Sequence, residues 1–98
     1  MKKIILLYDG HYDDVDILIV PNNIADNIEE VVWDFNVWLQ NPDNNYRFRV
    51  TKEYGTFLSI DTQEFLWWLN NVRIMGKDKA KIDCQHTNFV EGYPVAYF

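Results

Sequence analysis

Two short apolar runs open the chain, and a polar segment separates them. Aliphatic and β-branched residues dominate positions 3–8 and 15–20, which predicts a buried strand and an antiparallel partner that ends at Pro21. The polar segment between the two runs is then the connecting loop of a hairpin.

Apolar residues in the following segment recur at helical spacing. Asn22 or Asn23 is a suitable N-cap, and the pattern predicts a helix that runs to about Gln40. The side of this helix that faces the core would consist of Ile24, Ile28, Val31, Val32, Phe35, Trp38 and Leu39. Turn-forming residues at 41–45 then end the helical pattern.

A second hairpin and a second helix are predicted in the other half of the chain. Alternation of apolar and polar residues indicates a half-buried strand at 46–51, which should pair with a strand at 56–60. Asp61 can cap the helix that follows, with Glu64 reaching back as in a capping box. The buried residues of the strand and the helix would be Tyr46, Phe48, Val50, Phe65, Trp68, Leu69 and Val72. Two further strands are predicted at 80–84 and 95–98.

The predicted order is β-β-α-β-β-α-β-β, which indicates an α+β fold with two helices packed on a largely antiparallel sheet. The 98 residues suit one domain, residues 1–98, because 48% are hydrophobic and only seven are Gly or Pro. The motif F-x-x-W-L-[QN]-N occurs at 35–41 and again at 65–71. It indicates either a duplicated hairpin-helix unit or, as we favour, two helices that need similar anchors on one sheet.

The charge of the chain is unevenly distributed. The net charge is -6, and residues 4–46 contain nine acids without a single Lys or Arg. Such a surface argues against nucleic acid as a direct partner and favours a protein with a basic surface. No apolar run approaches the roughly 20 residues of a membrane span. Together with the single cysteine, this predicts a cytoplasmic protein that does not enter membranes.

The outer face of the first predicted helix is the strongest candidate for a binding site. At about 100° per residue, Trp33 and Val37 project opposite the apolar side. The acids that would surround them are Asp26, Glu29, Glu30 and Asp34. An aromatic anchor inside a charged rim is typical of interaction hot spots. Alternatively, Trp33 packs against Trp67 of the second helix or is covered in a homodimer.

The loop at 8–16 is a weaker candidate, because its acids could ligate a metal ion. Asp9, His11, Asp13 and Asp14 offer suitable oxygen and nitrogen atoms, but their spacing matches no known metal-binding loop. A solvated hairpin loop is the simpler interpretation. Cys84 and His86 lie two apart on a predicted strand, where we expect Cys84 to be a small buried residue. No phosphate-binding, hydrolase or dinucleotide motif occurs, so no cofactor is expected.

The leading hypothesis is therefore a small protein-interaction module that docks an acidic helix on a basic partner surface. An inhibitor or immunity-type protein would act in this way, by analogy alone. A less favoured alternative is a metal-dependent ligand-binding protein or enzyme centred on the Asp/His loop with Cys84 and His86. A third alternative is a structural homodimer.

Overall fold

The computed structural model describes the whole chain, residues 1–98. Its elements are β1 (Lys2–Leu7), β2 (Val15–Val20), α1 (Asn22–Asp26), α2 (Ile28–Leu39), α3 (Pro42–Asn45), the 3-10 turn η1 (Tyr46–Phe48), β3 (Arg49–Lys52), β4 (Gly55–Leu58), α4 (Thr62–Trp68), the π-turn η2 (Leu69–Arg73), β5 (Lys81–Thr87) and β6 (Val95–Tyr97). This order confirms the predicted α+β fold.

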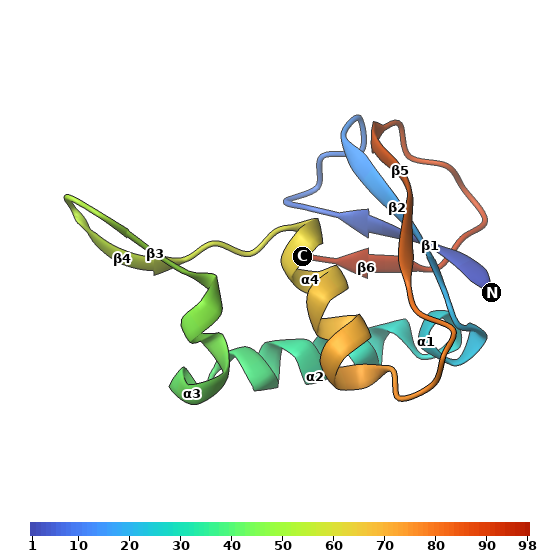
Figure 1. Ribbon diagram of the computed structural model, residues 1–98. Helices are drawn as coiled ribbons and strands as arrows, with labels where there is room; N and C mark the ends of the chain where they lie inside the picture. The colour runs from blue at the N-terminus through green and yellow to red at the C-terminus, as the bar shows by residue number, and fades with distance from the viewer.

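Four of the strands form one sheet in the order β5-β2-β1-β6, and β3 and β4 form a separate hairpin (Figure 1). β1 pairs antiparallel with β2, and β2 pairs antiparallel with β5. The C-terminal strand β6 lies parallel to β1, with Ile5 opposite Val95. The sheet is thus mostly antiparallel, and the predicted terminal strand is part of it.

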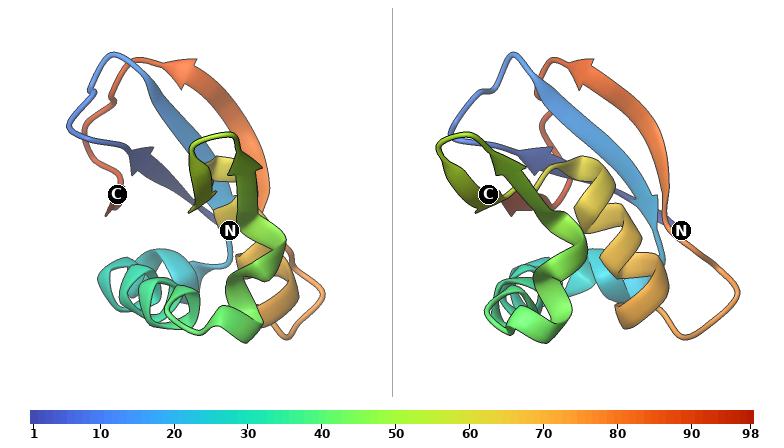
Figure 2. Two further views of the ribbon diagram at one scale, coloured as in Figure 1. Left: turned by 90° about the vertical axis from the view of Figure 1, so that its left-hand side faces the viewer. Right: turned by 60° about the vertical axis from the view of Figure 1, so that its left-hand side comes forward.

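Both faces of the sheet are covered. Ile4 and Leu6 point into the main core, which the helices close on one face (Figure 2). Ile5 and Leu7 point to the opposite face, where they cluster with Val15 and Ile17 and pack against Phe89 and against Val95 of the neighbouring strand β6. Alternating residues of β1 are therefore buried on both sides, which explains why this strand is a continuous apolar run.

The first predicted helix is interrupted at Asn27, so it forms two helices, α1 and α2. Asn27 has φ -125° and ψ 34°, outside the helical region, and its side-chain amide donates to the carbonyl of Asn23 at 2.9 Å. Pro21 occupies the N-cap position, and neither Asn22 nor Asn23 caps the helix. The predicted apolar side is confirmed: its residues are buried in α1 and most of α2, and half-buried at Trp38 and Leu39.

The strand predicted at 46–51 begins only at Arg49, because the preceding residues are helical. Asn41 accepts a hydrogen bond from the backbone N–H of Asp43 and so caps α3, with Pro42 in its first turn. The helical path through η1 buries Phe48 but leaves Tyr46 exposed. The prediction that Tyr46 is buried was therefore wrong.

The second helix begins as predicted, since Asp61 accepts from the backbone N–H of Thr62. Glu64 does not complete a capping box, because no hydrogen bond joins its carboxylate to the backbone N–H of Asp61. Phe65, Trp68 and Leu69 are buried, whereas Val72, predicted to be buried, is exposed because the chain widens into η2. The hairpins before the two F-x-x-W-L motifs differ in position, since only β1–β2 belongs to the main sheet.

Candidate functional site

The outer face of α2 exposes the two predicted apolar anchors. Trp33 is 69% exposed and Val37, one turn later, is 49% exposed. The alternative in which Trp33 packs on Trp67 is wrong. The ring of Trp67 instead lies 6.2 Å from the ring of Trp38 and 5.8 Å from that of Phe48, measured between centroids.

Two of the four predicted rim acids are neutralised by cations from distant parts of the chain. Lys2 forms an ion pair with Asp26, and Arg73 Nη2 lies 3.7 Å from Asp34 Oδ2. Glu29 and Glu30 are exposed and have no such partner. The break at Asn27 also separates Asp26, which lies in α1, from the other three acids, which lie in α2. The uncompensated negative charge is thus concentrated in the first turn of α2.

A shallow hollow adjoins these two acids. Its volume is about 520 Å³, and its lining consists of Ala25, Asp26, Asn27, Ile28, Glu29, Glu30 and Pro94. Trp33 follows Glu29 by four residues and Glu30 by three, so its side chain is their neighbour on the helix surface. Carboxylates, a hollow and an exposed indole therefore lie next to one another on this face.

The Asp-rich loop does not gather its acids. Residues 9–14 are all exposed, and no three His, Cys, Asp or Glu side chains are arranged to hold a metal ion. Asp9 and Gly10 both have positive φ and form a tight turn within the connection, in which the N–H of His11 donates to the carbonyl of Tyr8 at 2.9 Å. Of the four candidate ligands, Asp14 contacts another ionisable side chain, namely His86.

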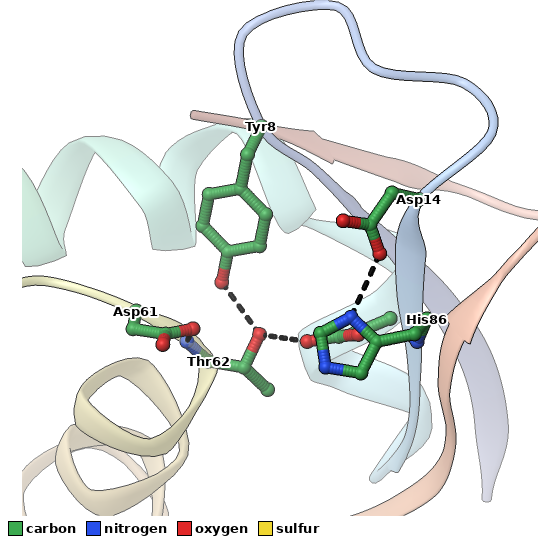
Figure 3. Close-up of polar contacts among 6 residues, drawn as sticks. Tyr8, Asp14, Asp61, Thr62 and His86 are labelled. Carbon is green, nitrogen blue, oxygen red and sulfur yellow. Dashed lines mark hydrogen bonds and ion pairs between the residues drawn. The ribbon is translucent and has the colours of Figure 1, made fainter.

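A buried polar network, which was not predicted, joins the end of β1, the start of β2 and the start of α4 (Figure 3). The fully buried hydroxyl of Thr62 donates to the carboxylate of Asp16, which is 6% exposed. The hydroxyl of Tyr8 lies 2.7 Å from that of Thr62. Because a threonine hydroxyl has one hydrogen and gives it to Asp16, Tyr8 must be the donor in this contact.

Tyr8 remains protonated under ordinary conditions. Burial raises its pKa well above the usual value, and the carboxylates of Asp61, Asp16 and Glu64 add to the effect. Its ring stacks on Phe98 at 5.1 Å. Tyr8 is therefore a fixed hydrogen-bond donor in the network.

His86 connects the network to the surface. Its backbone N–H donates to Asp16 at 3.0 Å, and its ring Nδ1 lies 2.8 Å from Asp14 (Figure 3). The hydrogen bond to Asp14, followed by the negative charges of Asp14 and Asp16, raises the pKa of His86. A hollow of about 240 Å³ at this point is lined by Tyr8, His11, Asp14, Asp16, Asp61 and His86.

Cys84 is exposed, so the prediction that it is buried was wrong. β5 is an edge strand of the sheet, and its pairing with β2 shifts register on both sides of Cys84. His86 has a positive φ of 54°, which further disturbs the alternation of side chains. No hydrogen bond joins Cys84 to His86, so the two do not form a nucleophile–base pair.

Comparison with known proteins gave no match, whether to protein-family models, to curated sequences or to solved structures. No helix in the chain has the length and apolar character needed to cross a bilayer.

Proposed function

We propose that the chain is a protein-interaction module that docks the outer face of α2 on a basic surface of a partner protein. The observation that carries this proposal is the exposure of Trp33 beside two unpaired glutamates, Glu29 and Glu30. A tryptophan left in water gains most from being covered by a partner, which is why tryptophan is enriched in hot spots.

The chemistry of the face indicates the kind of partner. The acidic hollow beside Trp33 suits an arginine or lysine side chain of the partner. The indole and Val37 can pack against apolar side chains, and the indole can also stack on a guanidinium group. Negative charge on the rim would also speed the encounter with a basic protein. An inhibitor or immunity-type protein that covers the basic surface of another macromolecule would use such a face.

The stability of variants separates a docking face from a structural one. About a third of Trp33 is buried, which corresponds to roughly 80 Å² of a fully buried tryptophan and about 2 kcal/mol at most. Alanine returns about 0.5 kcal/mol through its higher helix propensity. We therefore expect Trp33→Ala to cost about 1 kcal/mol, against about 3 to 5 kcal/mol for the fully buried Phe35→Ala.

The binding test uses the immobilised chain to capture partners from cells, followed by calorimetry with the purified partner. Trp33→Ala and Glu30→Lys should each weaken binding at least about tenfold, because each removes part of a hot spot. Tyr54→Ala and Glu91→Lys are matched controls at exposed positions outside α2 and should bind as the wild type does. Equal loss of binding in the controls, or a Trp33→Ala variant as unstable as Phe35→Ala, would refute the proposal.

A further inference from the structure

The hairpin formed by β3 and β4 extends away from the rest of the molecule (Figure 1). Its strands pair only with each other, and every residue from 51 to 58 is exposed. A two-stranded hairpin without a covering layer is marginally stable in water. Contact with another surface would therefore stabilise this part of the chain.

One face of the hairpin is largely apolar and carries one cation, Lys52. Val50 lies opposite Phe57 in the register, and the ring of Tyr54 stacks on that of Phe57 at 6.3 Å. Tyr54 is 83% exposed and Phe57 is 42% exposed. The other face is polar at its centre, where the hydroxyls of Thr51 and Thr56 form a hydrogen bond of 3.1 Å.

The two edges of the hairpin differ in charge. β3 carries Arg49 and Lys52, whereas residues 55–60 contain no charged residue and no proline. Natural proteins protect exposed edges with charges, prolines or bulges, and the β3–β4 register is continuous, without a bulge. The β4 edge is thus open to the addition of another strand.

We propose that β4 of one chain pairs antiparallel with β4 of a second copy, which gives a four-stranded sheet β3-β4-β4-β3 about a two-fold axis. The charges favour this occupant. An acidic partner segment would be attracted to the basic β3 edge. The β4 edge carries no charge, so two β4 edges can pair without electrostatic repulsion. With strands about 4.8 Å apart, the two β3 strands lie about 14 Å apart, beyond the roughly 8 Å screening length. Pairing through β3 would instead place these cations on adjacent strands.

The two-fold axis also explains the aromatic face. An axis perpendicular to the sheet leaves the Phe57 rings of both copies on the same side, so the two apolar faces become one continuous surface. Such an interface uses the same patch on both chains and closes as a dimer. It lies on a different surface from the outer face of α2, so the dimer and the proposed docking function stand independently.

Sedimentation of the wild-type chain and of charge variants, from micromolar to submillimolar concentration, tests the proposal. The wild type should show a reversible monomer–dimer equilibrium. Thr56→Lys and Thr56→Glu should each raise the dissociation constant by about tenfold or more. The two-fold axis brings the new charges of both copies into one interface, where like charges repel. An equimolar mixture of these two variants should dimerise again.

Thr51→Lys and Thr51→Glu are matched controls, since Thr51 is the cross-strand partner of Thr56 on the outer strand. These variants should dimerise as the wild type does, and so should Trp33→Ala. A wild-type chain that is monomeric at every concentration would overturn the proposal, as would a Thr51→Lys effect equal to that of Thr56→Lys. Either result would leave the binding measurements on α2 unaffected.

Discussion

Removing the hydroxyl of Thr62 tests whether the buried network stabilises the fold. Thr62→Val keeps the shape of the side chain but deletes the donor to Asp16 and the acceptor for Tyr8. Each polar group left unsatisfied in the interior costs about 1 to 3 kcal/mol, and more when it is charged. Asp16 retains the backbone N–H of His86, so we expect a total loss of about 2 to 4 kcal/mol.

Urea unfolding measures this loss of free energy of unfolding. In thermal unfolding, the same loss should lower the Tm of a chain of this length by roughly 10 to 20 °C. Thr62→Ser is the decisive comparison, because it loses a buried methyl group, at a cost of about 1 kcal/mol, but keeps the hydroxyl. The order of stability should be wild type, then Ser, then Val. Thr51→Val, at an exposed site, should stay within about 0.5 kcal/mol of the wild type. A Val variant as stable as the Ser variant would refute the reasoning.

Two predictions concern pH. Because folding raises the pKa of Tyr8, the stability it contributes is complete below about pH 10, its ordinary pKa, and is lost as the pH rises further. The urea concentration at the unfolding midpoint should therefore decrease above that pH, and it should decrease less steeply with pH in Tyr8→Phe. Equal pH dependence in the two proteins would contradict the burial of the phenol. His86 also has a raised pKa, so its ion pair with Asp14 contributes fully below its ordinary pKa of 6.5 and is lost as the pH rises through the raised value. In Asp14→Asn, NMR titration of the imidazole protons should give a pKa for His86 closer to 6.5, and an unchanged pKa would contradict the contact.

Periodicity identified the elements well wherever one face of an element meets the core. The spacing of Ile28, Val31 and Phe35 placed Trp33 on the opposite side of α2, and its exposure confirms that placement. This success is local, because the direction of a side chain on a helix follows from the helical repeat alone. The neutralisation of Asp26 and Asp34 was not predictable in the same way, since Lys2 and Arg73 lie far away in the sequence.

Predictions failed where tertiary structure overrides alternation. Tyr46 fits a strand pattern. The helix capped by Asn41 nevertheless continues as helical turns up to Phe48, and in this conformation the side chain of Tyr46 points to solvent. Cys84 alternates with charged residues, but it lies on an edge strand between two register shifts and is exposed, so alternation does not bury it. Alternation of apolar and polar residues shows that a strand has two different faces. Which face is buried depends on the elements that pack against the sheet.

The network around Asp16 shows which sequence signal was available and why it was insufficient. A carboxylate between Val15 and Ile17 in an apolar strand violates binary patterning, and a buried charge requires partners. Those partners are Thr62 and the backbone of His86, which lie 46 and 70 residues further along the chain. The contact exists because α4 begins beside the start of β2, a result of topology that no local pattern contains. An aspartate at an apolar strand position therefore predicts that a distant hydroxyl or amide will be buried with it, without predicting which one.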